Sequence, residues 1–350
     1  MTTIEVNASK SYNVEIGHGL LPQLGEKVAA LGKAKKVCIV SESNVWPLYG
    51  ASADISLHNA GFDTCHFVFP AGEESKNGAT YLELLNFLAE SHLTRSDIIV
   101  ALGGGVVGDL AGFAAATFLR GIRFVQVPTT LLAAVDSSVG GKTAIDLPAG
   151  KNLAGAFWQP SLVLCDTDCL ATLPEDIFRD GCAEVIKTAI LFDEKLFLEL
   201  VRDGLDFDRE SVIARCVAHK RDIVNADEFD RGERQKLNLG HTIGHGVEAL
   251  SNFTLSHGKS VAIGAAIVAR AAANLGICDY GVSARIQWLL QSFGLPIFAD
   301  SSAEDLMTMA LSDKKRSGSI VNLIIPLAIG NCVIRPTPVE EIESFIQAGL

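Results

Sequence analysis

The chain has 350 residues, of which 48% are hydrophobic and 20% are charged. This length corresponds to roughly two domains of 100–200 residues, and the apolar composition excludes a mainly disordered chain. The net charge of −12, from 29 Lys and Arg against 41 Asp and Glu, argues against nucleic acid or an anionic membrane as partner. We therefore expect a small-molecule ligand, and an anionic one would require basic side chains gathered in a cleft.

Short runs of β-branched residues alternate with helical patterns up to about residue 170. The runs that predict buried strands are Val37–Ser41, Cys65–Phe69, Ile98–Leu102, Phe124–Val127 and Leu162–Cys165. Helices are predicted between them at 78–91 and 109–118. This alternation favours a parallel, doubly wound sheet whose pairing order the sequence leaves open.

After Pro174 the pattern is almost wholly helical. The predicted helices span 174–191, 208–228, 233–250, 259–275, 280–293, 303–316 and 339–347. One short strand pair is predicted at Ile320–Ile325 and Cys332–Ile334, around the turn residues Gly330-Asn331. We therefore predict an α/β domain over 1–170 and an all-α domain over 171–350, with the ligand bound in the cleft between them.

Composition and segment lengths favour a cytoplasmic protein. The first residues, Met1–Val6, contain no basic segment and no apolar core of a secretory signal. The most apolar window, Val261–Ile277, is interrupted by Arg270 and Asn274 and falls short of the ~20 residues that cross a bilayer. The 8 cysteines are scattered without a Cys-x-x-Cys pair, which is typical of free thiols in a reducing compartment.

A glycine-rich motif follows one predicted strand directly. Gly103–Asp109 comes after Ile98–Leu102 and opens a helix. Glycines allow a pyrophosphate to approach the backbone N–H groups at a helix N-terminus. The acidic residue expected about 20 positions later is absent, although Glu42 ends an earlier strand. The motif favours a bound dinucleotide, and a turn that only packs helix on strand is the alternative.

A second glycine loop ends in a lysine. Gly140-Gly141-Lys142-Thr143 lacks the leading glycine of a P-loop, so we reject a nucleoside triphosphate site. Lys151-Asn152 follows shortly after, again beside a glycine. Lysines next to glycines suit phosphate contacts, with solvated surface lysines as the alternative.

Five polar residues recur at helical spacing within 233–250. They are Arg234, Asn238, His241, His245 and Glu248. On one continuous helix they would lie within an arc of about 80°. Gly240, Gly244 and Gly246 weaken this helix by up to about 1 kcal/mol each, which indicates close approach by another group. We interpret the arc as a functional face rather than a solvated amphipathic one.

Histidines of the same region predict a metal site. His241 and His245 are four residues apart, and His257 opens the next predicted helix. Glu184 and Lys187 share one face of an earlier helix. A catalytic zinc takes about three nitrogen or oxygen ligands, and Glu184 with two of the three histidines would supply them. Spacing alone leaves open which two histidines bind.

Together these motifs resemble those of the 3-dehydroquinate synthases, in the sugar-phosphate cyclase superfamily. The segments that carry the resemblance are Gly103–Asp109, Arg120-Gly121, Val127–Ala133, Asp136–Thr143, Lys151-Asn152, Glu184-x-x-Lys187, Leu237–Thr242, His245, His257-Gly258 and Asp313–Lys315. It extends over nearly the whole chain. It implies a Rossmann-like NAD-binding domain, which agrees with the predicted α/β half, and an all-α metal-binding domain.

The resemblance also implies a role for individual positions. Zn²⁺ or Co²⁺ would be held by Glu184, His241 and His257. The positions implied for NAD, with the strand-end Glu42 added, are Glu42, Glu73, Lys76, Gly105, Val106, Val107, Gly108, Asp109, Thr129, Thr130, Lys142, Lys151, Cys169, Leu170, Ala171 and Thr172. The positions implied for substrate are Asp136, Lys142, Asn152, Lys187, Lys220, Arg234, Asn238, His245 and Lys314. Arg120 would reach across a homodimer.

The implied reaction converts 3-deoxy-D-arabino-heptulosonate 7-phosphate into 3-dehydroquinate and phosphate, in the shikimate pathway to aromatic amino acids. Bound NAD⁺ removes a hydride, phosphate leaves by β-elimination, and the hydride returns. The ring then opens and an intramolecular aldol step closes the carbocycle. The cations that would form a local positive cleft are Arg120, Lys142, Lys187, Lys220, Arg234 and Lys314.

Two departures and three alternatives accompany this interpretation. Lys259-Ser260 stand where Glu-Ala is usual, and Asp230 stands where Glu is common. The alternatives are a 2-deoxy-scyllo-inosose or valiolone-type synthase, a glycerol-dehydrogenase-like enzyme, and an inactive NAD-binding regulator. The retained substrate positions favour a dehydroquinate synthase over the first. The basic cluster argues against the second, and the intact ligand set argues against the third.

Overall fold

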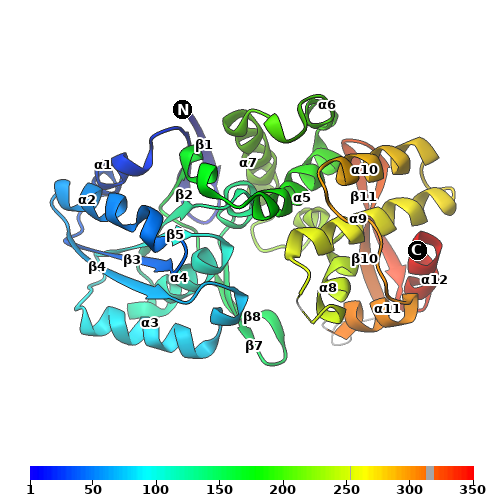
Figure 1. Cartoon of the computed structure of the whole chain (residues 1–350). Helices are drawn as coiled ribbons and strands as arrows, with labels where there is room; N and C mark the ends of the chain where they lie inside the picture. The colour runs from blue at the N-terminus through cyan, green and yellow to red at the C-terminus, as the bar shows by residue number, and fades with distance from the viewer. Residues whose placement is uncertain (253, 313–318) are drawn as a thin grey trace. The chain divides into compact units, whose positions relative to one another are not determined.

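The computed structural model describes residues 1–252, 254–312 and 319–350. The chain divides into two units, one formed by Met1–Leu173 with Arg209–Phe229 and the other by Pro174–Asp208 with Asp230–Leu350 (Figure 1). The sequence predicted a single change of domain at residue 170. The structure differs in one segment, because α7 (Arg209–Ala226) packs on strands of the N-terminal unit.

The N-terminal unit is built on a sheet with the strand order β1-β2-β9-β6-β5-β3-β4. Its strands are β1 (Thr2–Asn7), β2 (Ser11–Gly17), β3 (Lys36–Glu42), β4 (Asp63–Phe69), β5 (Ile98–Gly103), β6 (Arg123–Pro128) and β9 (Leu162–Asp166). β1 and β2 pair antiparallel, and the other neighbours pair parallel. All five strands predicted up to residue 170 lie in this sheet, and the strand pair predicted around Gly330-Asn331 forms a separate hairpin in the other unit. The β1–β2 hairpin was not predicted, because its segments alternate polar and apolar residues instead of forming apolar runs.

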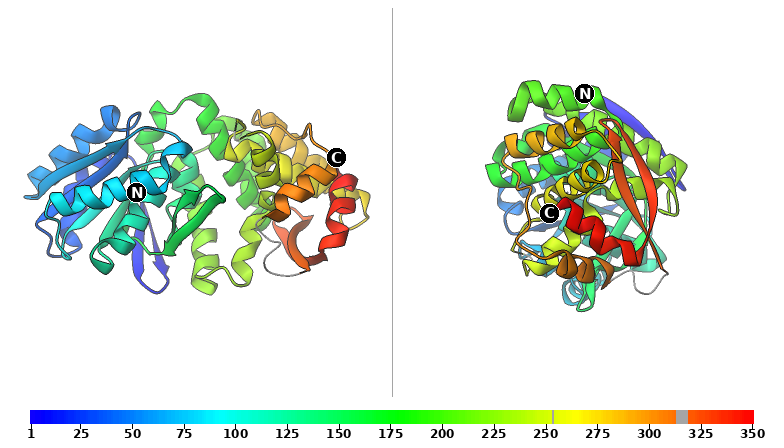
Figure 2. Two further views of the ribbon diagram at one scale, coloured as in Figure 1. Left: turned by 90° about the horizontal axis from the view of Figure 1, so that it is seen from below. Right: turned by 90° about the vertical axis from the view of Figure 1, so that its right-hand side faces the viewer.

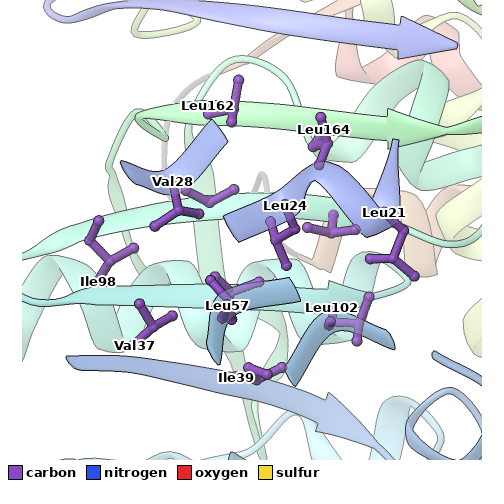
Figure 3. Close-up of a cluster of buried hydrophobic side chains, with 14 of the residues drawn as sticks. Leu21, Leu24, Val28, Val37, Ile39, Leu57, Ile98, Leu102, Leu162 and Leu164 are labelled. Atoms are coloured by element: carbon purple, nitrogen blue, oxygen red, sulfur yellow. The ribbon is translucent and has the colours of Figure 1, made fainter. Parts of the chain in front are cut away.

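Alternate residues of the central strands enter two different cores. Val37 and Ile39 point to the face covered by α1 and α2 (Figure 3). Cys38 and Val40 point to the face covered by α3 and α4. The covering helices are α1 (Leu24–Ala30), α2 (Ala51–Asn59), α3 (Gly78–Glu90) and α4 (Gly105–Thr117). A sheet buried on both faces explains the continuous apolar runs in the sequence and confirms the predicted α/β domain.

Three smaller elements of this unit carry predicted site residues. β7 (Lys142–Leu147) and β8 (Gly150–Phe157) form a separate antiparallel hairpin. The short π-helix η5 (Ala133–Ser137) follows β6, and the 3₁₀ helix η6 (Thr167–Thr172) follows β9. All of these elements come after strands that lie inside the parallel part of the sheet.

The C-terminal unit is helical, as predicted, but it is not all-α. Its helices are α5 (Glu175–Phe192), α6 (Glu194–Asp203), η8 (Glu233–Asn238), α8 (His241–Leu250), α9 (His257–Asn274), α10 (Tyr280–Ser292), α11 (Ala303–Ser312) and α12 (Val339–Gly349). β10 (Ile320–Ala328) and β11 (Asn331–Pro338) form an antiparallel hairpin that packs with α12 (Figure 2).

The described part of the chain contains no helix whose length and apolar character would let it cross a membrane.

The Asp97 side chain, just before β5, forms hydrogen bonds with the backbone at the beginning of β3 and with Thr94. Its Oδ1 accepts the N–H groups of Lys35 and Lys36 at 3.1 and 2.8 Å. Its Oδ2 accepts the N–H and the hydroxyl of Thr94, both at 2.7 Å. Burial raises the pKa of this carboxyl, but the hydrogen bonds outweigh burial and hold the pKa below its ordinary value.

We expect Asp97→Asn to lower the free energy of unfolding by about 1.5–3 kcal/mol, because asparagine would turn a donor toward Thr94. Since the pKa of Asp97 is lower in the folded state, its stabilisation is present at neutral pH and is lost as pH falls below about 4. Urea unfolding at neutral and acid pH measures this difference, with the exposed Asp63→Asn as control. An equal loss at both pH values would contradict the assignment.

Candidate active site

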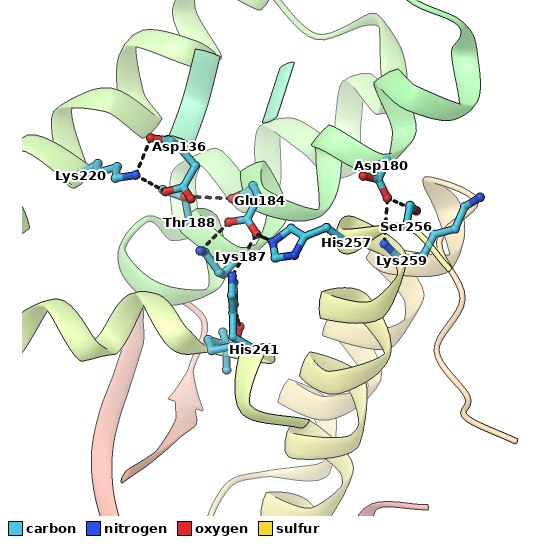
Figure 4. A network of polar contacts seen from close by, with 11 residues as sticks. Asp136, Asp180, Glu184, Lys187, Thr188, Lys220, His241, Ser256, His257 and Lys259 are labelled. Atoms are coloured by element: carbon cyan, nitrogen blue, oxygen red, sulfur yellow. Dashed lines mark hydrogen bonds and ion pairs between the residues drawn. The ribbon is translucent and has the colours of Figure 1, made fainter. Parts of the chain in front are cut away.

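Three potential metal ligands converge from three helices of the C-terminal unit. Glu184 lies on α5, and His241 and His257 are the first residues of α8 and α9. Nε2 of each histidine lies 3.4 Å from Glu184 Oε1 (Figure 4). The three ligand atoms all lie within 4.8 Å of one another. This set of nitrogen and oxygen donors fits a catalytic zinc ion.

Neighbouring groups fix the chemical state of these ligands. Nδ1 of His241 lies 3.1 Å from the Leu239 carbonyl oxygen, so it is the protonated nitrogen and Nε2 is left to bind a metal. Burial, helped by the Lys187 ammonium, lowers the pKa of His241 well below its ordinary value, which keeps the ring neutral. Burial also lowers the pKa of His257, but the hydrogen bond to Glu184 outweighs it and raises that pKa. Lys187 Nζ lies 2.5 Å from Glu184 Oε2, with both side chains almost fully buried.

The predicted helix over 233–250 is interrupted in the structure. Glu233–Asn238 form the 3₁₀ helix η8, and Gly240, with a φ of 77°, precedes α8 in the left-handed region. Arg234 and Asn238 therefore lie outside the helix that carries His241. The prediction of one polar face across the whole segment is wrong for these two residues.

The glycines of α8 allow two helices to approach each other closely. A Cβ on Gly240 would lie 2.5 Å from Val261 O, and one on Gly244 would lie 2.7 Å from Ser260 O, both on α9. The close approach predicted from these glycines therefore exists, but the neighbour is a helix backbone. This packing holds the first residues of α8 and α9 together, with their imidazole centroids 5.2 Å apart.

Asp180 is a site residue that the sequence reasoning missed. It lies on α5 one turn before Glu184, and its Oδ1 accepts hydrogen bonds from the Lys259 N–H at 3.0 Å and from the Ser256 hydroxyl (Figure 4). These bonds hold the first turn of α9, which begins with His257. The i, i+4 spacing of the two α5 carboxylates was a signal present in the sequence. The unusual lysine at 259 leaves the contact intact, because its backbone is the donor.

His245 lies one turn after His241 on α8 and is exposed. Its ring centroid lies 5.6 Å from that of His241 and 6.1 Å from that of His257. It forms a second trio with Glu248 and His257, whose ligand atoms also lie within 4.8 Å of one another. The Glu184 trio is more buried, and its carboxylate contacts both histidines, so it is the stronger candidate.

The glycine motif forms the turn between β5 and α4. Gly104 caps the helix, and Gly105–Asp109 form its first turn. A Cβ on Gly104 would lie 3.0 Å from Thr130 Cγ2, and one on the next residue would lie 3.2 Å from Ser137 Oγ, so side chains would fill this turn. Thr129 Oγ1 is buried and has no hydrogen-bond partner among the described residues. A bare helix N-terminus with an unsatisfied hydroxyl fits an anionic cofactor.

A buried lysine joins residues that were predicted separately for cofactor and substrate. Lys76 Nζ lies 2.6 Å from Asp109 Oδ2, 2.6 Å from Asn152 Oδ1 and 3.6 Å from Glu73 Oε1. Lys151 Nζ lies 3.8 Å from the same Glu73 oxygen. Burial lowers the pKa of Lys76, but Asp109 and Glu73 outweigh burial and raise it, so the lysine stays charged.

Asp146 on β7 holds this network and was also missed. Its Oδ1 accepts the Asn152 N–H at 2.7 Å, and its own N–H donates to Lys76 O at 2.7 Å. Asn152 has a φ of 57°, in the left-handed region that non-glycine residues seldom adopt. The bond from Asp146 supports this conformation. No motif marks Asp146 in the sequence.

Two further groups of predicted residues have defined contacts in the N-terminal unit. Lys220 Nζ on α7 lies 2.6 Å from Asp136 Oδ1 on η5 and also contacts the Asp136 carbonyl. The Tyr49 hydroxyl lies 3.0 Å from Cys169 O and 2.5 Å from the Thr172 hydroxyl, in η6. Tyr49 therefore holds a segment that was predicted to contact NAD.

The remaining residues predicted for the site lie at separate positions of the structure. Glu42 accepts backbone N–H groups of the turn that follows β3. Arg120 is exposed and has a φ of 67°. Lys142 is the exposed first residue of β7, and Arg234 is 2% exposed in η8. Lys314 lies outside the described residues.

Comparisons with known proteins decide the family. The family model described as 3-dehydroquinate synthase N-terminal matches residues 66–180, and the one described as 3-dehydroquinate synthase C-terminal matches residues 181–316. The curated 3-dehydroquinate synthase of Pelobacter propionicus is 46% identical over 351 residues, which cover 98% of each chain. The chain belongs to the 3-dehydroquinate synthase family. This confirms the predicted enzyme class, a carbon–oxygen lyase of the shikimate pathway.

Two solved structures of similar fold are sugar-phosphate cyclases. A 2-deoxy-scyllo-inosose synthase, solved with carbaglucose-6-phosphate, NAD⁺ and Co²⁺, has a TM-score of 0.88 and 26% identity over 100% of both chains. The 2-epi-5-epi-valiolone synthase of Streptomyces hygroscopicus, solved with NAD⁺ and Zn²⁺, has a TM-score of 0.89 and 26% identity over 98% of both chains. Both represent alternatives weighed from the sequence, and the higher identity to the curated dehydroquinate synthase favours that family over them.

Proposed function

We propose that the chain converts the heptulosonate phosphate into 3-dehydroquinate and phosphate, with NAD⁺ and a zinc or cobalt ion as cofactors. The observation that carries this proposal is the convergence of Glu184, His241 and His257 in the buried part of the C-terminal unit. Family membership supplies the reaction class. The two cyclases solved with NAD⁺ and Co²⁺ or Zn²⁺ support the choice of cofactors.

The cofactor sites are proposed from the donors that this chain presents. Glu184, His241 and His257 would hold the metal ion, and Gly105–Asp109 with Thr129 would hold the pyrophosphate of NAD. When bound, NAD⁺ accepts and returns a hydride while the metal ion polarises the oxygen on the reacting carbon.

Several residues of this chain have proposed roles toward the anionic substrate. Asn152 Oδ1 accepts a hydrogen bond from Lys76, so its amide nitrogen is left to donate to phosphate oxygens. Lys142 begins the same hairpin and would add a positive charge to the phosphate site. His245, exposed beside the proposed ligands but outside that set, is positioned to carry a proton.

The substrate carboxylate is assigned to Arg234, because a guanidinium binds a carboxylate through two parallel hydrogen bonds. Lys220 was predicted to share this role, and its contact with Asp136 indicates that it also balances that carboxylate. A carboxylate clamp distinguishes a dehydroquinate synthase from cyclases whose sugar phosphates have no carboxylate.

Arg234→Lys is expected to lower kcat/KM by about one to two decades, because lysine keeps the charge but loses the planar fork. Initial rates of phosphate release measure the effect, with the exposed Arg231→Lys in the same segment as control. Turnover of glucose 6-phosphate or sedoheptulose 7-phosphate as fast as the heptulosonate phosphate would contradict the clamp and favour a neighbouring cyclase activity.

Asp180→Ala is expected to weaken zinc binding by about 10- to 100-fold, because the first turn of α9, which presents His257, loses its acceptor. Zinc titration into the chelator-stripped protein measures this affinity. Asp176→Ala, an exposed carboxylate on the same helix, is the control. Equal affinity in wild type and Asp180→Ala would contradict a positioning role for Asp180.

A homodimer in the cytoplasm is proposed as the working state. The exposed Arg120, held in a left-handed conformation after α4, is suited to contact the substrate of a second copy. Arg120→Ala is then expected to keep the dimer, as measured by sedimentation, while kcat/KM falls.

A further inference from the structure

Two cysteines outside the site described above are direct neighbours in the sheet. Cys38 on β3 is the register partner of Cys65 on β4, and the two strands are parallel. Both side chains lie on the face covered by α3 and α4. Neighbouring strands lie about 4.7–4.9 Å apart, which falls within the range of about 4.4–6.8 Å between the Cα atoms of a disulfide.

The two thiols have unequal surroundings. Cys38 is fully buried, whereas Cys65 is partly exposed because β4 is the edge strand of the sheet. The ammonium of Lys36 lies close by and donates to Ser91 O at 2.6 Å. Hydrogen bonding by the Cys38 thiol, together with Ser91 and Lys36, lowers the pKa of Cys65 to about 7 against the effects of burial and of Asp97.

The other cysteines provide a comparison within the same chain. Burial raises the pKa of Cys169 and of Cys332 to about 12, and it raises the pKa of Cys165 as well. Cys278 is partly exposed like Cys65, but burial and the neighbouring Asp279 raise its pKa. Cys65 and Cys278 are both partly exposed, but of these two only Cys65 has neighbours that lower the pKa and favour the thiolate.

We propose that Cys65 and Cys38 form an oxidation site for small hydroperoxides, with Cys65 as the attacking thiolate and Cys38 as the resolving thiol. The Cys65 sulfur attacks the O–O bond of hydrogen peroxide and becomes a sulfenic acid, while hydroxide leaves and is protonated to water. The Cys38 thiol then attacks this sulfur, and a second water leaves as the disulfide forms. Two electrons and two protons pass from the thiols to the peroxide.

The disulfide would be readily reduced. Cys65 is partly exposed on the edge strand, so an external thiol can reach its sulfur and open the disulfide by exchange. The site is thus suited to reversible oxidation rather than to permanent cross-linking.

Alkylation of the native protein tests the reactivity of Cys65. With limiting iodoacetamide near neutral pH, peptide mass spectrometry should show Cys65 modified at least about threefold faster than Cys278. Lys36→Gln should slow Cys65 and leave Cys278 unchanged. Equal rates at the two cysteines, or faster reaction of Cys278, would overturn the proposal.

Peroxide treatment tests the pairing. Wild type should give a Cys38–Cys65 disulfide that dithiothreitol reverses. Cys38→Ser, or Cys38→Ala if the serine variant does not fold, should stop at a Cys65 sulfenic acid that dimedone traps. Cys65→Ser should give neither product. Accumulation of sulfenic acid in wild type without a disulfide, or no oxidation at Cys65, would contradict the assignment.

Discussion

Glu184→Gln is expected to abolish tight metal binding and to lower kcat/KM by at least about a hundredfold. Glutamine offers the metal ion only a neutral oxygen, and loss of Lewis-acid assistance costs several kcal/mol, where about 1.4 kcal/mol is tenfold in rate. The change also leaves the buried Lys187 without its carboxylate, which lowers the free energy of unfolding by about 3–5 kcal/mol. Metal content by plasma mass spectrometry and urea unfolding give two independent readouts.

Two matched variants make this prediction specific. Glu175→Gln changes an exposed carboxylate on the same helix, paired with Arg179 at 2.5 Å, and should keep metal and activity. Glu248→Gln tests the second trio of the site, and it should also keep the metal. If Glu184→Gln kept its full metal content and Glu248→Gln lost the metal, the metal site would have to be assigned to the second trio.

Lys76→Met is expected to lower the melting temperature by about 10 °C and to weaken NAD⁺ binding. Lys76 is 4% exposed, and its removal leaves the buried Asp109 carboxylate without its partner at a cost of about 3–5 kcal/mol. It also removes the bond that orients the Asn152 amide. Calorimetry and NAD⁺ titration of the purified variant measure the two effects.

The double variant Lys76→Met/Asp109→Leu separates charge from packing. Removing both charges should restore much of the lost stability, because a buried ion pair replaced by apolar residues is often nearly neutral. Lys236→Met, which breaks a partly exposed pair with Glu233, should cost about 1 kcal/mol at most. If Lys76→Met were as stable as wild type, the Lys76 network would contribute nothing to the stability of the fold.

The parallel sheet could be predicted because its strands are buried on both faces. Segments such as Ile98–Leu102 then read as continuous apolar runs, and the glycine motif at the end of β5 marks the turn into α4. The hairpin β1–β2 was not predicted, because it alternates polar and apolar residues. The placement of α7 with the N-terminal unit depends on packing partners far away in the sequence, which no local pattern reveals.

The metal ligands were only partly determined by spacing. Helical spacing predicted that His241 and His245 lie on one helix face. In the structure, His241 and His257 are the histidines that contact Glu184, because α8 and α9 pack closely through glycines. The resemblance to the family implied that set, while the residues alone left it open. Asp180 was missed because its partners Ser256 and Lys259 lie far away in the sequence. Asp146 was missed because no motif marks it, and its N–H bonds to the distant Lys76.

The most direct test of the proposed function is the stoichiometry of turnover. The purified chain is incubated with the heptulosonate phosphate, zinc and an amount of NAD⁺ far below that of the substrate, and phosphate, NADH and the carbon product are followed together. We predict one phosphate and one 3-dehydroquinate for each substrate consumed, with many turnovers per NAD⁺ and no accumulation of NADH. NADH formed in step with substrate loss, without phosphate release, would contradict the account and make the chain a dehydrogenase.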